Sequence, residues 1–188
     1  FKLPYKISKF SSKLNKQNWI NDDTNNNIIE NSQIAGLLKR MAEDNYDLDR
    51  VSFTKIVPNF VVDKLPKDIS YIEDTKARKK IFISIVLPLI VENNKKINLK
   101  RNRLLNIYEK LAVSKTLSLT EHNWLMNLAV EYSVITKHVH KITIAKTLLK
   151  HVDIIPNSIA IAQAAKESGW GTSRFAQEGN ALFGQWTY

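Results

Sequence analysis

Apolar residues recur at helical spacing through the middle of the chain. Between residues 73 and 91 they fall at steps of four, with further apolar residues beside them, which predicts a helix with one broad apolar face. Pro88 should kink this helix, because proline lacks a backbone donor and clashes with the preceding turn. A similar period runs from 97 to about 113, and Asn93-Asn94 is a candidate interruption between the two. We therefore expect a pair of helices here.

Shorter signals lie on both sides of this stretch. Residues 34–45 carry a short helical period, and a further helix is expected over 142–150. Ser118–Glu121 has the spacing of a capping box and opens a helix that runs to about 132. The stretch 51–62 is extended in character, but alternating strand patterns are otherwise scarce. The predicted class is therefore mainly α.

The segment 153–188 has the most informative pattern. Pro156-Asn157-Ser158 is a helix start signal, and Gly169 is placed to end that helix. The run Ile159–Ala165 is small and apolar on nearly every face, so we expect a helix that is buried all round. Glu167 lies in its last turn, and we expect its carboxyl group to open onto a groove.

The position of Glu167 favours a neutral carboxylic acid. The C-terminal end of a helix carries partial negative charge, which disfavours an ionised acid there. Burial beside Trp170 would add desolvation, so both effects are expected to favour the protonated form. A carboxylic acid that keeps its proton suits general-acid cleavage of a glycosidic bond. The alternative is a glutamate that points into solvent at a helix end.

Composition and charge narrow the classes of protein. With 188 residues, 44% of them hydrophobic, the chain is long enough for one globular domain, or one domain plus an appendage. The net charge is +10, and eleven basic residues against two acidic ones lie between Lys76 and Thr116. This stretch, 76–115, is either a solvated helix face or a contact for anionic cell-wall polymers or a membrane surface. No aromatic interleaving supports a nucleic-acid partner, and none is expected.

Neither a cofactor nor a metal is expected. The chain has no Cys, which excludes disulfides, thiolate zinc sites, iron–sulfur clusters and a cysteine nucleophile. The four His show no metal-ligand spacing apart from His138-x-His140, which is a weak signal. The sequence also lacks a Gly-rich phosphate loop and a Ser/His/Asp arrangement.

Three regions are expected along the chain. Residues 1–50 are expected to form a flexible or loosely packed N-terminal segment, because they include a polar tract rich in Asn, Ser, Lys and Asp. Residues 51–140 are expected to form a helical region, and residues 141–188 to begin a further domain. The chain starts at Phe1, not Met, and stops directly after an aromatic run at Tyr188, so we expect further sequence at both ends.

Three runs of the C-terminal segment carry a family likeness: Ala162–Gly171, Ser173–Ala176 and Gly179–Trp186. Through these runs, residues 148–188 resemble the first half of a bacterial glucosaminidase domain. They are similar to the Bax-type proteins, relatives of the flagellar peptidoglycan hydrolase. Glu-Ser-Gly alone is shared with the lytic transglycosylases, whereas Glu-Ser-Gly-Trp-Gly-Thr-Ser followed by Asn-x-Leu-Phe-Gly is specific. A less specific likeness extends upstream to about residue 51.

The resemblance implies a lysozyme-like α (α+β) domain, present only in its first half and preceded by a helical N-terminal region. It implies an exported periplasmic or cell-envelope enzyme of endo-β-N-acetylglucosaminidase type. Its partner would be the glycan strands of peptidoglycan, cut at β-1,4 bonds after N-acetylglucosamine. It places the catalytic acid on Glu167 and substrate contacts on Gln163, Trp170, Asn180, Phe183, Trp186 and Tyr188.

The second catalytic group is not identified. Glycosidases usually need two carboxylates, or one carboxylate and an assisting group of the substrate. In the family the second acid lies some tens of residues beyond the Leu-Phe-Gly motif, so we expect it past Tyr188, and Glu178 is not a candidate. The competing interpretations are a lytic transglycosylase, which uses one Glu and no water, and a non-catalytic module that binds wall glycan.

Some of the motif residues also have purely structural interpretations. Core packing is the alternative for three aromatic residues, Trp170, Phe183 and Trp186. Helix termination is the preferred interpretation for Ser168 and Gly169.

Overall fold

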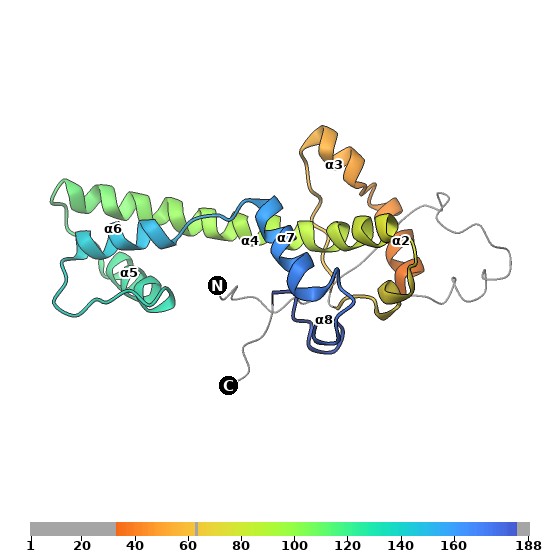
Figure 1. The fold of residues 1–188 in the computed structure, drawn as a ribbon. Helices are drawn as coiled ribbons and strands as arrows, with labels where there is room; N and C mark the ends of the chain where they lie inside the picture. The colour runs from red at the N-terminus through yellow and green to blue at the C-terminus, as the bar shows by residue number, and fades with distance from the viewer. Residues whose placement is uncertain (1–32, 63, 184–188) are drawn as a thin grey trace. The chain divides into compact units, whose positions relative to one another are not determined.

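The computed structural model describes residues 33–62 and 64–183. Every regular element among these residues is helical and no strand occurs among them, which confirms the expected mainly α class. Seven of the elements are α-helices and one is a 3₁₀-helix (Figure 1). They are α2 (Gln33–Glu43), α3 (Leu48–Thr54), η1 (Lys67–Tyr71), α4 (Thr75–Ala112), α5 (Leu119–Glu131), α6 (Lys141–His151), α7 (Asn157–Ser168) and α8 (Arg174–Gly179).

The chain divides into two compact units. Unit 1 contains the described residues up to Glu92 and those from Pro156 onward, and unit 2 is Asn93–Ile155. The long helix α4 therefore contributes residues to both units. The sequence predicts domain boundaries after residues 50 and 140. The division into two compact units does not test these boundaries, which stay predictions.

The expected pair of helices over 76–115 is wrong, because α4 runs without interruption from Thr75 to Ala112. Pro88 lies inside this helix and is buried. Asn94 does not break it, because its side-chain amide bonds elsewhere: Nδ2 donates to the Ile155 carbonyl (2.7 Å) and Oδ1 accepts from the Ile155 N–H (3.2 Å). An asparagine held in this way does not compete for the backbone groups of its own helix.

Unit 1 has its core between α2, the first part of α4 and the chain that connects them. Tyr46 and Phe60 pack with their ring centroids 5.1 Å apart, and the Tyr46 hydroxyl donates to the Ser84 carbonyl (2.8 Å). The helix expected over 34–45 is confirmed as α2. Other buried side chains of this core are Ile34, Leu37, Met41, Leu65, Ile69, Phe82, Ile85 and Val86.

The stretch 51–62 is extended only in part. Its first four residues belong to α3, so the expectation of an extended conformation there is wrong. Local capping explains the difference. The Asp47 carboxylate accepts from the Asp49 N–H (2.6 Å) at the start, and Lys55 takes a left-handed conformation with φ 59° at the end. These caps outweigh the β-branched composition of the stretch.

Unit 2 has its own core, built by α5, α6 and the second part of α4. The predicted capping box is confirmed. The Ser118 hydroxyl accepts from the Glu121 N–H (3.2 Å), and the Glu121 carboxylate accepts from the Ser118 N–H (2.9 Å). The helix expected over 142–150 is confirmed as α6. The core consists of Leu104, Ile107, Leu125, Leu128, Ala129, Ile144, Ala145, Leu148 and Val152.

None of the helices within residues 33–183 combines the length and the apolar character that a membrane span requires. Among the same described residues, no group of three or more His, Asp or Glu side chains is arranged to hold a metal ion.

Candidate functional site

Helix α7 carries Glu167 in its last turn, as predicted. It begins at Asn157 after Pro156 and ends where Gly169 adopts a left-handed conformation with φ 58°. The expectation that this helix is buried all round is wrong, because Ile159 is 57% exposed and only one face is covered. A run of small apolar residues has no polar face, so the sequence could not show which side is covered. The covered residues are Ala160, Ala164, Ala165 and Ser168.

The chain after Glu167 forms an unusual left-handed turn. Three successive residues have positive φ: Gly169 at 58°, Trp170 at 58° and Gly171 at 82°. This region is open to glycine, but for a residue with a side chain it costs about 1–2 kcal/mol. The strained conformation of Trp170 therefore has to be held by its surroundings.

Ser168 ties the end of α7 to this turn. Its side chain is fully buried, and its hydroxyl donates to the Ala164 carbonyl (2.6 Å) and accepts from the Gly171 N–H (3.0 Å). The Ser173 N–H also donates to the Ser168 carbonyl (2.9 Å). The interpretation of Ser168 and Gly169 as helix-terminating residues is confirmed.

Gly171 fits into the core against α4 and the segment before η1. A Cβ atom at this position would lie 3.2 Å from the Phe82 ring and 3.4 Å from a Leu65 methyl group. The Gln177 side chain fixes the same residue from α8, because its Nε2 donates to the Gly171 carbonyl (2.5 Å) and to the Pro66 carbonyl (3.3 Å). The turn is thus held by residues from three separate parts of unit 1.

Trp170 is half-buried between two residues of α4. Its ring meets Phe82 edge-on with centroids 5.7 Å apart, and the Lys79 Nζ atom lies 4.8 Å from the centroid of the Trp170 ring. Edge-on aromatic packing and a cation over an indole face are both stabilising contacts. Packing therefore accounts for the position of Trp170, and its predicted contact with substrate stays a prediction.

Glu167 itself is exposed on α7. Gln163 lies four residues earlier and is also exposed, so the two side chains share one face of the helix. Among residues 33–183, no hydrogen bond or ion pair engages the Glu167 carboxylate. The described residues do not bury Glu167, so the desolvation expected there is not provided by this part of the chain.

The other predicted contacts lie downstream of the turn. Asn180 ends α8 in a left-handed conformation with φ 51°, and its N–H donates to the Phe175 carbonyl. Asn180 and Phe183 are both half-buried. Trp186 and Tyr188 lie outside the described residues. The predicted roles of all four in substrate binding stay predictions.

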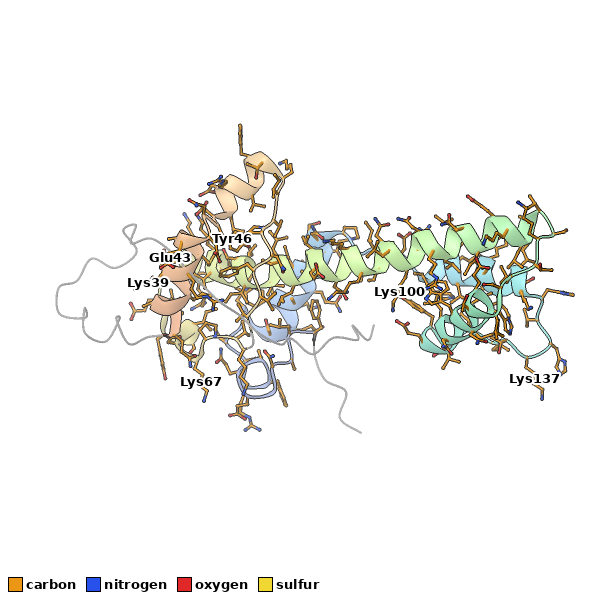
Figure 2. All side chains as sticks on the ribbon, turned by 180° about the vertical axis from the view of Figure 1, so that it is seen from behind. Lys39, Glu43, Tyr46, Lys67, Lys100 and Lys137 are labelled. Carbon is orange, nitrogen blue, oxygen red and sulfur yellow. The ribbon has the colours of Figure 1, made fainter. Side chains whose placement is uncertain are left out.

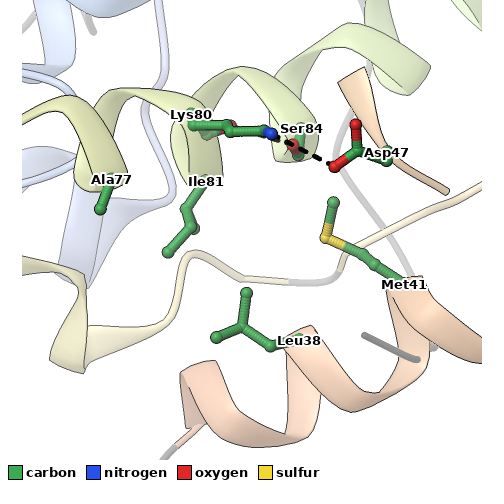
Figure 3. A pocket seen from close by; sticks show the side chains of 7 residues that line it. All are labelled: Leu38, Met41, Asp47, Ala77, Lys80, Ile81 and Ser84. Atoms are coloured by element: carbon green, nitrogen blue, oxygen red, sulfur yellow. Dashed lines mark hydrogen bonds and ion pairs between the residues drawn. The ribbon is translucent and has the colours of Figure 1, made fainter. Parts of the chain in front are cut away.

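Glu167 lines neither of two cavities that the described residues form. The first, of about 40 Å³, lies between α2 and α4, where the Lys80 ammonium group pairs with Asp47 (3.2 Å; Figure 3). Lys80 also pairs with Asp49 (2.8 Å). The cavity has room for about one or two waters and is mostly apolar, so it is a packing defect. Its lining residues are Leu38, Met41, Asp47, Ala77, Lys80, Ile81 and Ser84. The groove expected beside Glu167 stays a prediction.

The carboxylates beside this cavity favour the charged form of the Lys80 ammonium group. Burial alone would lower the pKa of Lys80, but its hydrogen bonds to Asp49 and Asp47 outweigh that effect and raise it. The same hydrogen bond from Lys80 lowers the pKa of Asp49. Both ions are therefore charged near neutral pH, and they fix the start of α3 to α4.

The second cavity is an open depression of about 530 Å³ on unit 2. The ion pair between Lys110 and Glu121 lies within it. The hydrogen bond from Lys110 comes first among the causes that lower the pKa of Glu121 to about 2, ahead of its bond from the Ser118 N–H. With cations and carboxylates interleaved in this depression, it has no clear preference for a charged ligand.

Many cations of the stretch 76–115 have partners within the protein. Arg78 donates to the Ile72 carbonyl (2.9 Å), and Lys100 pairs with Glu131. The Arg103 guanidinium lies 4.5 Å from the centroid of the Trp124 ring. Part of this basic charge is therefore structural, and its contact with an anionic surface stays a prediction.

Sequence reasoning missed the residues that shape the turn. Gly171, Gln177 and Lys79 act through contacts with residues far away in the chain, which no local pattern reveals. The one available signal was the repeated glycine on either side of Trp170, since paired glycines often mark a tight turn or a close backbone approach.

Comparison with known proteins points to the same segment. Residues 142–187 match the Glucosaminidase family, described as mannosyl-glycoprotein endo-beta-N-acetylglucosaminidase. The chain is also similar to Protein bax of Escherichia coli (strain K12), with 38% identity over 107 residues. That match covers 57% of this chain but 38% of the relative, so the chain spans well under half of the relative's length. No solved structure matches the chain. The resemblance to Bax-type glucosaminidases is confirmed.

Proposed function

We propose that the protein is a cell-wall glycosidase that cleaves β-1,4 bonds of peptidoglycan after N-acetylglucosamine, with Glu167 as general acid. The observation that carries the proposal is the position of Glu167. It lies inside the segment that matches the glucosaminidase family, exposed at the end of α7, directly before a turn that buried contacts hold in one shape. A rigid support of this kind suits a proton donor that must meet one oxygen atom.

The substrate would complete the environment of Glu167. A glycan strand lying along the exposed face of α7 would cover the carboxyl group and exclude water, which favours the neutral form that donates a proton. Gln163 on the same face could bond sugar hydroxyl groups. The other proposed contacts are Trp170, Asn180, Phe183, Trp186 and Tyr188, whose aromatic and amide groups suit sugar recognition.

A second group has to stabilise the cation-like transition state. Glu178 is a poor choice, because it is exposed and pairs with Arg174 (3.6 Å) on the same helix. We propose that the assisting group is either the acetamido group of the substrate or a carboxylate that lies outside the described residues.

The proposed setting is the cell envelope, after export. The basic stretch 76–115 would add an electrostatic contact with anionic wall polymers or with the membrane surface. Exposed charges act over about 10 Å at 0.1 M salt, so this contribution to wall binding should weaken as salt rises. Wall binding that is insensitive to salt would contradict it.

Product analysis tests the proposal against its competitors. Peptidoglycan is digested with this chain and with any longer product of the same gene, and the new ends of the strands are identified. Hydrolysis leaves a reducing N-acetylglucosamine end, which is the expected result. An anhydro sugar would identify a lytic transglycosylase. Binding of glycan by every form without new ends would identify a non-catalytic module and overturn the proposal.

A further inference from the structure

Positive charge is concentrated in unit 2. Asn93–Ile155 contains eleven Lys and Arg against four Asp and Glu, a net charge of +7, which leaves +3 for the rest of the chain out of its total of +10. All four His are also in this unit. A charge of this size on a small helical unit creates a field that attracts polyanions.

The few carboxylates of unit 2 are largely neutralised. Glu121 pairs with Lys110, Glu131 with Lys100, and Asp153 with Arg101 (3.5 Å). The stretch 132–152 then contains no Asp or Glu at all. Its four lysines are all exposed, and no ion pair with a carboxylate engages them among the described residues: Lys137, Lys141, Lys146 and Lys150.

The conformation of the loop between α5 and α6 exposes one of these lysines to solvent. Val134 and Val139 pack against the core of unit 2. The Val139 N–H donates to the Thr136 carbonyl (3.3 Å), which closes a turn between them. Lys137 lies at the tip of this turn and extends away from the helices (Figure 2). Ile135 is 77% exposed although it is a large apolar residue.

The outer face of α6 continues this pattern. The helix buries Ile144, Ala145 and Leu148. Residues spaced four apart lie on the opposite face, and these are Ile142, Lys146 and Lys150. Ile142 is partly exposed, so an apolar side chain again lies beside lysines.

We propose that this face of unit 2 docks on a bilayer that contains anionic phospholipid. We call it the α5–α6 surface, and its residues are Ile135, Lys137, Ile142, Lys146 and Lys150. Lysines at a membrane surface bind headgroup phosphates, while neighbouring apolar side chains enter the boundary with the acyl chains. A soluble polyanion has no apolar region for the two isoleucine side chains to enter. Their exposure among lysines therefore favours a lipid surface over a wall polymer.

Binding to vesicles tests this proposal. The full chain is sedimented with vesicles of phosphatidylglycerol and phosphatidylcholine in equal parts, and with vesicles of phosphatidylcholine alone. A lysine near an anionic membrane contributes about fivefold in partitioning, so Lys137→Glu with Lys146→Glu should lower binding by about 30-fold or more. The matched control, Lys39→Glu with Lys67→Glu in unit 1, makes the same change in net charge at two exposed lysines (Figure 2).

Ile135→Ser tests whether the anionic ligand is a lipid surface or a soluble polymer. It should weaken binding to the mixed vesicles several-fold and leave binding to soluble polyphosphate unchanged. Circular dichroism confirms that each variant keeps its helices. The proposal is overturned if the control pair loses as much binding as the surface pair, or if neutral vesicles bind equally well. It is also overturned if Ile135→Ser has no effect on the mixed vesicles, because charge alone would then account for the binding.

Discussion

The turn after Glu167 in unit 1 and the α5–α6 pair in unit 2 are built in opposite ways. α5 starts with a capping box whose two partners are three residues apart, and the α6 face follows a simple helical period. The turn depends on contacts between distant segments, such as the hydrogen bond from Gln177 to Pro66, which spans 111 residues. Helices α5 and α6 are thus specified by residues that are close together in the sequence. The turn after the candidate catalytic residue forms only when distant segments meet in the folded chain.

Gly171→Ala should have the largest effect on stability and should confine it to unit 1. The added Cβ would meet the Phe82 ring at 3.2 Å and hold a side chain at φ 82°, which should cost about 2–4 kcal/mol in free energy of unfolding. Denaturant unfolding measures the loss. Amide hydrogen exchange, resolved by peptide, should show faster exchange in α7 and α8 than in α5 and α6.

The matched control is Gly36→Ala in α2. Gly36 is exposed within a helix, and nothing lies within 4 Å of an added Cβ. Alanine should therefore stabilise the protein by about 0.5–1 kcal/mol. Equal effects of the two substitutions would mean that the turn is not held against α4 as described.

Arg101→Ala should have the next largest effect, and in unit 2. The Arg101 guanidinium donates to the Leu149 carbonyl (2.8 Å) and to the Val152 carbonyl (2.6 Å), so it caps the end of α6. Charged hydrogen bonds of this kind contribute about 1.5–3 kcal/mol, and the alanine variant should lose about 2 kcal/mol. Its exposed ion pair with Asp153 adds little.

Arg103→Ala is the comparison for Arg101. Arg103 is exposed on α4 and its guanidinium group lies over the Trp124 ring, a contact worth about 0.5–1 kcal/mol. Hydrogen exchange in α6 should accelerate in the Arg101 variant and not in the Arg103 variant. If both variants behave alike, Arg101 does not act as the cap of α6.

The smallest effect should appear as a pH dependence of unit 2. The pKa of Glu121 is lowered from 4.5 to about 2, first by its bond from Lys110. A lowered pKa stabilises the folded state above the unfolded value, and that contribution is lost as pH falls through about 2. Helix α5 should therefore become easier to unfold between about pH 4.5 and pH 2, as hydrogen exchange can measure.

Glu121→Gln should flatten this pH dependence, because glutamine has no charge to lose. Glu109→Gln is the control, since no ion pair engages Glu109 among the described residues. If the stability of α5 changes equally with pH in both variants, the pair of Lys110 and Glu121 does not set the acid response of α5.

The sequence predicted the features that depend on local contacts and did not predict those that depend on distant ones. The start of α5, the helix α6 and the end of α7 at Gly169 were all predicted, because each depends on residues within one turn. The continuity of α4 through Asn93-Asn94 was not predicted, because the partner of Asn94 lies 61 residues away. Propensity is a weak guide where a distant contact decides.

The candidate site shows the same limit. The motif around Glu167 was sufficient to recognise the family likeness and to place the acid at a helix end. It could not show that α7 covers one face only, nor that Ser168, Gly171 and Gln177 lock the turn. Those facts depend on which segments meet in the fold, and Trp186 and Tyr188 lie outside the described residues.

The most direct test of the central claim compares two glutamates of unit 1. Glu167→Gln keeps the size of the side chain but removes the proton that it would donate, whereas Glu178→Gln changes a residue that pairs only with Arg174 among the described residues. General-acid catalysis is worth about 10²–10⁴-fold, so the rate of peptidoglycan cleavage should fall by at least about 100-fold in the first variant and stay unchanged in the second. Both variants should unfold at the same denaturant concentration as the parent. Cleavage by Glu167→Gln at the parental rate would show that Glu167 is not the acid.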